Sequence, residues 1–247
     1  MSEINHQKKL FHLNIDSQLS LKDEIVIVAL KSYALNDLLI SKLIEGSAEL
    51  LFLQNGLLTK SKVQNRSSRI AIGTILGIQA TLQNETLRVT VQNSAIAVES
   101  QQGCNKIREL VVRSKLPNSI IDNKPNVNIM IYEKFVRWVI TSCLNLAYDA
   151  SLGDCLAEIS TKELRVGISE LAIFVEKKFN VKVDQANILE ALYKLPKALK
   201  TSSYIDIKKG APAEIIFELE NVIEYFANAN IECVVLSKWR QEILNDK

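Results

Sequence analysis

Residues 203–212, SYIDIKKGAP, place an acidic and a basic side chain two positions apart. On a β-strand, this spacing puts Asp206 and Lys208 on the same face. A carboxylate and an ammonium group on one face of a strand are residue types that metal-assisted hydrolysis can use. Such a site needs a second carboxylate, and the upstream candidates are Asp184 and Glu190, which lie in a helical pattern.

The same stretch ends a lysine-rich segment. Residues 177–209 contain eight lysines and three acids, a net charge of +5, whereas residues 210–247 contain seven acids and three bases, a net charge of −4. Positive charge gathered on one element favours contact with phosphate. The lysines predicted to contact nucleic acid are Lys182, Lys194, Lys197, Lys200, Lys208 and Lys209. Gln185 and Asn187, near the start of a predicted helix, have amides that can pair with adenine edges.

The histidines and cysteines exclude several kinds of site. The only histidines are His6 and His12, so a histidine-rich zinc site is excluded, and neither stands in a setting typical of a catalytic triad. The cysteines form no C-x-x-C pair and indicate reduced, buried thiols in a cytosolic protein. They are Cys104, Cys143, Cys155 and Cys233.

The bulk composition is that of a globular protein. The chain has 247 residues, of which 47% are apolar and 23% charged, with a net charge of +2. That charge creates no global attraction for nucleic acid or membranes, so any electrostatic contact must be local. The polar N-terminus has no apolar run typical of a signal peptide, and no apolar run is long enough to span a membrane. We expect a cytoplasmic protein without membrane contact.

The elements around these residues divide at a segment rich in proline and asparagine. We predict an α+β domain over residues 1–114, a linker over 115–128 and a second domain over 129–247. In the first domain, a helix over residues 20–46 packs on an antiparallel sheet, although its IVIVAL segment is also typical of a strand. Asn55-Gly56 predicts a hairpin turn, and alternating apolar residues predict strands over 70–82 and 87–98.

The order of elements in the second domain is more informative. A long amphipathic helix covers EKFVRWVITSCLNLAYDA, followed by a short β-like piece, ELRVG, and a helix over ISELAIFVEKKFN. Asp184 is the predicted N-cap of a helix over residues 185–199, and Pro196 predicts an end or kink near Leu195. Two alternating runs around KKGAP predict strands, and the chain closes with a short strand or a packed helix.

This order resembles the winged helix-turn-helix family over roughly residues 130–220. The resemblance implies that QANILEALYKLPKAL is the recognition helix and that IKKGAP is the tip of the wing. It also implies double-stranded DNA as the partner and a homodimer or a larger complex as the assembly.

YIDIKK also resembles the second half of the PD-(D/E)xK nuclease motif. That resemblance implies that Asp206 binds Mg²⁺ and that Lys208 orients or activates the attacking water, with Asp184 or Glu190 as the second carboxylate. A second pair of this kind, Glu176 and Lys178 with Asp154 upstream, lies in a helical pattern.

The function predicted from the sequence is therefore DNA binding through a C-terminal winged helix, without enzymatic activity and without a cofactor. The first alternative is a Mg²⁺-dependent endonuclease. The second is a non-catalytic scaffold subunit of a larger complex.

Overall fold

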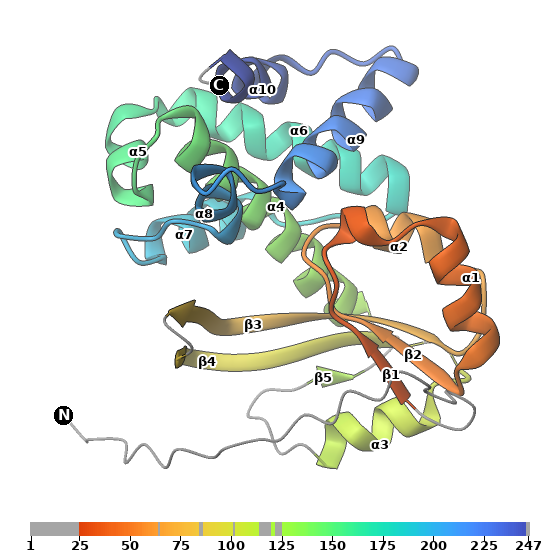
Figure 1. Ribbon diagram of the computed structural model, residues 1–247. Coiled ribbons are helices and arrows are strands. Elements are labelled where there is room, and N and C mark those ends of the chain that lie inside the picture. Colours follow the sequence, from red (N-terminus) through yellow and green to blue (C-terminus); the bar gives the residue numbers. More distant parts are fainter. Residues whose placement is uncertain are drawn as a thin grey trace.

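The computed structural model combines a five-stranded sheet with a group of helices (Figure 1). It describes residues 25–63, 65–83, 86–100, 102–113, 120–121 and 125–245. The strands are β1 (Ile25–Val28), β2 (Glu49–Phe52), β3 (Ile70–Gln83), β4 (Thr86–Ser100) and β5 (Ile120–Ile121), and they lie in the sheet in that order. β1, β2 and β3 run parallel, β4 is antiparallel to β3, and β5 is parallel to β4.

Helices cover both faces of the parallel strands. The short helix η1 (Ser32–Ala34) and α1 (Asp37–Gly46) connect β1 to β2, and α2 (Leu58–Val63) connects β2 to β3. Figure 1 shows α1 and α2 on one face and α3 (Asn105–Arg113) on the other. All four residues of β2 are buried, as expected for a parallel strand that is covered on both sides.

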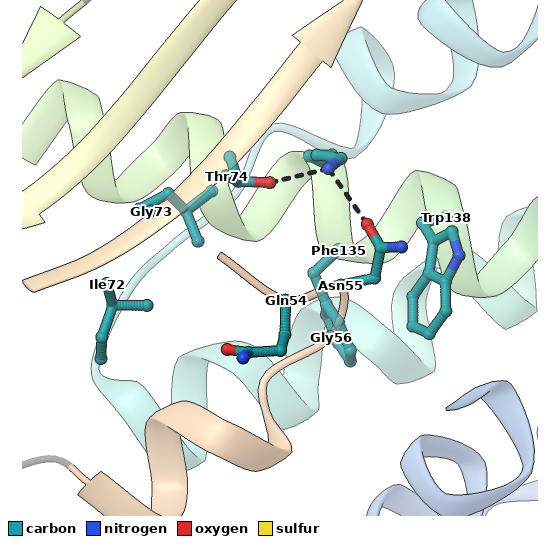
Figure 2. Close-up of a pocket in the computed structure, with 10 residues that line it drawn as sticks. Gln54, Asn55, Gly56, Ile72, Gly73, Thr74, Phe135 and Trp138 are labelled. Carbon is teal, nitrogen blue, oxygen red and sulfur yellow. Dashed lines mark hydrogen bonds between the residues drawn. The ribbon is translucent and has the colours of Figure 1, made fainter. Parts of the chain in front are cut away.

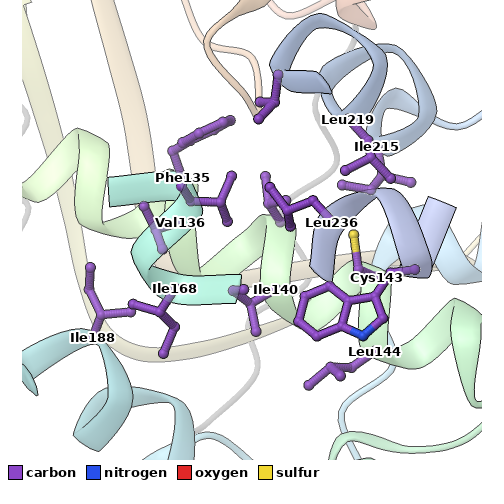
Figure 3. Packing of buried hydrophobic residues seen from close by; sticks show 14 of the residues in the cluster. Phe135, Val136, Ile140, Cys143, Leu144, Ile168, Ile188, Ile215, Leu219 and Leu236 are labelled. Atoms are coloured by element: carbon purple, nitrogen blue, oxygen red, sulfur yellow. The ribbon is translucent and has the colours of Figure 1, made fainter. Parts of the chain in front are cut away.

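The remaining helices pack around α4 (Pro125–Ala147). They are α5 (Leu152–Glu158), α6 (Thr161–Phe179), α7 (Gln185–Lys194), α8 (Ser202–Lys208), α9 (Glu214–Asn228) and α10 (Val234–Asn245). Figure 3 shows apolar side chains from α4, α6, α7, α9 and α10 meeting in one core. Leu57 and Ala97 from the sheet side join this core, so the two parts share a packed junction.

Several predicted elements are confirmed. Strands cover residues 70–83 and 86–100, and α4 and α6 cover most of the predicted helices over 133–150 and 168–180. The C-terminal segment forms the packed helix α10. α7 ends at Lys194 with Leu195 as its C-cap, so Pro196 follows the helix as predicted.

The predicted helix over residues 20–46 is wrong in its first half, where the β-branched IVIV run forms β1. The helix begins only at Asp37, where the side chain of Asn36 accepts a hydrogen bond from Leu39 N. Ser20, the expected N-cap, lies outside the described residues.

The purely antiparallel sheet and the hairpin at Asn55-Gly56 are also wrong. These two residues leave β2 and lead into α2, which carries the chain to a parallel partner.

The winged helix is the main error of fold class. Residues 202–208 form α8 rather than the rising strand of a wing, and ELRVG lies inside α6. The side chain of Thr201 accepts a hydrogen bond from Tyr204 N, which caps α8 at its start. Of the residues described after α4, none forms a strand, so this part of the chain has no wing.

The predicted linker contributes to both parts. Residues 120–121 pair with β4, and α4 begins at Pro125. No helix in the described part of the chain is long and apolar enough to cross a bilayer. The four cysteines are free thiols, and Cys104, Cys143 and Cys155 are buried.

Candidate active site at the carboxyl ends of β1 and β2

Two loops at the carboxyl ends of parallel strands face the helical part. One follows β1 and contains Lys31, directly before η1, and the other follows β2 and contains Asn55 and Gly56. In open α/β sheets, ligands bind outside the carboxyl ends of the strands. The side chains that meet these loops come from α4, α8 and α9.

Lys134 is the cation at the centre of this region. Its Nζ donates hydrogen bonds to Thr74 Oγ1 on β3 at 2.7 Å and to Asn55 Oδ1 at 3.2 Å (dashed lines in Figure 2). Phe135 and Trp138 of α4 lie beside it and line the same small cavity. The cavity has a volume of about 20 Å³, enough for one water molecule.

Burial lowers the pKa of Lys134 to about 8, and the nearby charge of Arg137 acts in the same direction. Glu214 opposes this shift. A lysine with a pKa near neutrality can donate a proton and take it back in the physiological range. The region therefore contains a group suited to general acid–base chemistry.

Two buried carboxylates of α9 hold the strand-end loops. Glu214 Oε1 accepts a hydrogen bond from Ser32 N at 2.9 Å, and Glu218 Oε1 accepts one from Leu58 N at 2.8 Å. Glu214 is 3% exposed and Glu218 is fully buried. Because Ser32 and Leu58 are the first residues of η1 and α2, which follow the loops after β1 and β2, one helix fixes the end of both loops.

Lys31 completes the contact from the β1 side. Its Nζ lies 2.8 Å from Asp206 Oδ2 on α8 and 3.9 Å from Glu214 Oε2. Partial burial acts to lower the pKa of Lys31, but the hydrogen bond to Asp206 and the charge of Glu214 outweigh it and raise the pKa. Lys31 is therefore a fixed cation at the edge of the region.

The residues predicted for metal chemistry do not come together. On α8, Asp206 contacts Lys31 whereas Lys208 pairs with Asp149 at 2.6 Å, because residues two apart on a helix point in different directions. Asp184 caps α7, and Glu190 pairs with Lys194.

The second candidate set for a metal site is also dispersed. Lys178 of α6 donates to Asn221, and Asp154 accepts a hydrogen bond from Ser151, while Glu176 lies on the same helix as Lys178. Within the described ranges, no group of acidic, histidine and cysteine side chains is arranged to hold a metal ion.

The residues predicted for nucleic-acid contact do not form one reading element. Asn187 Nδ2 donates to Glu133 Oε2 at 2.9 Å, Lys194 is paired with Glu190, and Lys200 Nζ lies 3.1 Å from Tyr204 Oη. The exposed residues of the set are spread over the loops and ends of α7 and α8. They are Lys182, Gln185, Asn187, Lys194, Lys197, Lys208 and Lys209.

The residues that gather at the loops are not among those predicted from the sequence. They are Lys31, Asn55, Thr74, Lys134, Glu214 and Glu218. The available signal was a pair of apolar runs, IVIV and ELLF, each followed within a few residues by polar side chains. The sequence predicts a turn at Asn55, and Lys134 lies in a predicted amphipathic helix in which no motif distinguishes it.

Comparisons with known proteins show the fold. No protein-family model and no curated protein matches the chain. Three solved structures match over most of its length, as follows. A D-mandelate dehydrogenase solved with NADH and anilino(oxo)acetate matches at 15% identity, over 93% of this chain and 77% of that chain, with a TM-score of 0.76. A 2-dehydropantoate 2-reductase from Geobacter metallireducens GS-15 matches at 19% identity, over 90% and 77%, with a TM-score of 0.70. A dimeric ketopantoate reductase from Staphylococcus aureus matches at 13% identity, over 92% and 80%, with a TM-score of 0.69.

These matches overturn the predictions made from the lysine-rich segment. The matched proteins are dehydrogenases and reductases of small molecules, so a DNA-binding protein with a DNA partner and a Mg²⁺-dependent nuclease are both contradicted. The scaffold alternative is dropped on the same finding. The expected absence of a cofactor is contradicted as well, because the matched D-mandelate dehydrogenase was solved with NADH. The fold of this chain is that of the ketopantoate reductase-like dehydrogenases, a Rossmann-like sheet joined to a helical domain.

Proposed function

We propose that this protein is a nicotinamide-dependent oxidoreductase that interconverts a small 2-oxo acid and its 2-hydroxy acid. The observation that carries the proposal is Lys134, a lysine with a lowered pKa that contacts both Asn55 and Thr74. It lies where the parallel strands of a dehydrogenase-like fold end. The names of the matched proteins are those of enzymes for 2-hydroxy and 2-oxo acids, which supports this substrate class.

Lys134 accounts for the proton in this reaction. Reduction of a ketone adds a hydride to carbon and a proton to oxygen, and a protonated lysine within hydrogen-bonding reach of that oxygen can supply the proton. In the direction of oxidation, the neutral amine takes the proton from the hydroxyl group. Asn55 and Thr74 keep Nζ oriented, because both accept hydrogen bonds from it.

We assign the substrate carboxylate to Arg137, whose charge acts on Lys134. It lies one turn after Lys134 on α4, and its guanidinium forms no salt bridge with another described residue. Burial lowers the pKa of Arg137, which the charge of Glu133 partly offsets. A guanidinium can bind a carboxylate through two parallel hydrogen bonds, which a lysine cannot do.

A nicotinamide cofactor would supply hydride transfer, but the described residues form no glycine-rich cradle for its pyrophosphate. The eight glycines of the sequence are never two positions apart, so it contains no G-x-G-x-x-G motif. The helix that follows β1 carries Asp37 in its first turn, where an anion would be repelled. The described residues therefore account for the substrate side and the proton, and not for a pyrophosphate cradle.

The test is turnover of a panel of 2-oxo acids by the purified chain with NADH or NADPH, followed through the absorbance of the reduced nicotinamide. We expect turnover that falls by about 10²-fold or more in Lys134→Met, the typical loss on removal of a general acid. In Arg137→Ala we expect KM to rise for substrates with a carboxylate, whereas Arg137→Lys retains part of the affinity. Equal rates in wild type and Lys134→Met would contradict the proposed role of Lys134.

The cytoplasmic location expected from the sequence remains part of this proposal. Four free cysteines are consistent with a reducing compartment.

A further inference from the structure

Glu218 is a buried carboxylate that the proposed chemistry does not use. It lies on α9, is fully buried, and its Oε2 has no hydrogen-bond partner among the described residues. An unsatisfied buried carboxylate destabilises a fold, and an apolar side chain of similar size would pack at lower cost. The contacts of the second carboxylate oxygen, Oε1, indicate what Glu218 does.

That oxygen holds the start of α2. Oε1 accepts a hydrogen bond from Leu58 N at 2.8 Å, the first residue of the helix. Leu57 N also acts on the carboxylate, since it lowers the pKa of Glu218 against the larger effect of burial. The carboxylate is thus anchored to the backbone of the loop that leaves β2.

Gly56 brings the same loop directly against the carboxylate. Its φ is +84°, a conformation that favours glycine, and a Cβ atom there would overlap Glu218 Oε1 and its neighbouring carbons. No larger residue fits without a shift of the carboxylate or the loop. The close approach fixes the loop in one position.

This position determines where Asn55 lies. Asn55 directly precedes Gly56, and its Oδ1 accepts a hydrogen bond from Lys134 Nζ (Figure 2). Glu218 contacts the backbone of residues 56–58, which directly follow Asn55. A change at the carboxylate therefore moves Asn55 and, with it, the hydrogen bond to Lys134. Glu218 itself does not line the cavity around Lys134.

We propose that Glu218 is a positioning residue that, together with Gly56, holds the loop of residues 54–58 so that Asn55 remains within reach of Lys134. The inference rests on the proposed function for its catalytic meaning, but its structural content can be tested without turnover. The titratable groups that face Glu218 are Glu214 on the same helix and Lys178 on α6.

Trp138 provides the readout, because it lines the cavity beside Lys134. Protein labelled with 5-fluorotryptophan should give two ¹⁹F resonances, from Trp138 and Trp239, and Trp138→Phe assigns them. We expect the Trp138 resonance to titrate with the pKa of Lys134, near 8, and this titration should vanish in Lys134→Met.

Three variants test the role of Glu218. Glu218→Gln retains an acceptor for Leu58 N, so it should keep the Trp138 resonance and its titration and change kcat by less than about threefold. Glu218→Leu removes the acceptor, so the resonance should shift, the titration should move or disappear, and kcat should fall by about tenfold or more. Gly56→Ala displaces the same loop from its other side and should reproduce these effects if Glu218→Leu does not fold.

Glu170 provides the matched control. It is a buried carboxylate of α6 that accepts hydrogen bonds from Val234 N, Val235 N and Leu236 N, at the start of α10 and far from the sheet (Figure 1). Glu170→Leu removes a helix cap of the same kind and should leave the Trp138 resonance unchanged.

The outcomes separate the two proposals. A wild-type Trp138 resonance and titration in folded Glu218→Leu and Gly56→Ala would overturn the positioning role, whatever the activity. A shift of Trp138 in these variants, in a protein that turns over no 2-oxo acid, would support the positioning role and contradict the proposed reaction.

Discussion

At the scale of single residues, the partly buried cation of Lys134 lowers the stability of the fold, and the same group is the proposed proton donor. Its cation is partly buried beside Asn55 and Thr74, which offer oxygen atoms but no negative charge. A charged group that lowers stability and lines a cavity at strand ends is typical of a functional site.

Lys134→Met should therefore stabilise the protein at pH 7 while it removes activity. The pKa of Lys134 is lowered from its usual value to about 8, so the folded state binds fewer protons than the unfolded state between about pH 8 and 10.5. The wild type should gain stability as pH rises through that window. We expect a gain of about 1–3 kcal/mol in the free energy of unfolding at pH 7 in Lys134→Met, measured by urea denaturation. A loss of stability in this variant would show that the lysine is structural.

Glu218 should make the free energy of unfolding decrease with pH, the opposite of the effect of Lys134, and at lower pH. Burial raises its pKa from 4.5 to about 7, so the folded state retains a proton that the unfolded state loses between these values. Stability should fall as pH rises from about 4.5 to 7, by at most about 3 kcal/mol. In Glu218→Gln this decline should be absent, and urea denaturation at several pH values measures it. A decline identical to that of the wild type would assign the slope to other groups.

At the scale of elements, the packing of α6 against α10 depends on a glycine. A Cβ atom at Gly167 would lie 2.7 Å from Cη2 of Trp239, a side chain that is fully buried. Trp239 Nε1 donates to Glu163 Oε1 at 3.0 Å, which limits its movement.

Gly167→Ala should consequently destabilise the protein, although alanine favours a helix by about 1 kcal/mol over glycine. Overpacking of a rigid indole costs about 1–3 kcal/mol, so the net effect should be a lower Tm. Neither Gly153→Ala nor Gly210→Ala is a clean comparison, because a Cβ at Gly153 would meet Cβ and the backbone of Lys197, and Gly210 has a φ of +71°, which favours glycine. An unchanged or raised Tm in Gly167→Ala would mean that Trp239 can adapt.

Local sequence patterns predicted many elements but not their pairing. The alternation in β3 and β4 and the amphipathic pattern of α4 and α6 were sufficient, because these segments are long and strongly periodic. YIDIKK alternates over too few residues to distinguish a strand from one turn or two of helix. Tertiary packing and the Thr201 cap make it α8.

At the scale of the whole molecule, the site depends on contacts between distant parts of the chain. Asn55, Thr74 and Lys134 come from a strand-end loop, β3 and α4, and the residues of α9 that hold the loops lie more than 150 positions further along than the loops themselves. No local sequence motif predicts such a set of residues. Parallel pairing of β1, β2 and β3 brings the loops together, and a sequence read as antiparallel hairpins places them elsewhere.

The measurement that tests the role of Lys134 most directly is the pH dependence of turnover in both directions. With Lys134 as proton donor, kcat for reduction of a 2-oxo acid should fall as pH rises through about 8, whereas kcat for oxidation of the 2-hydroxy acid should rise through the same pH. Both transitions should be absent from the residual activity of Lys134→Met. Profiles that are flat around pH 8, or that keep the same transitions in Lys134→Met, would contradict the role assigned to Lys134.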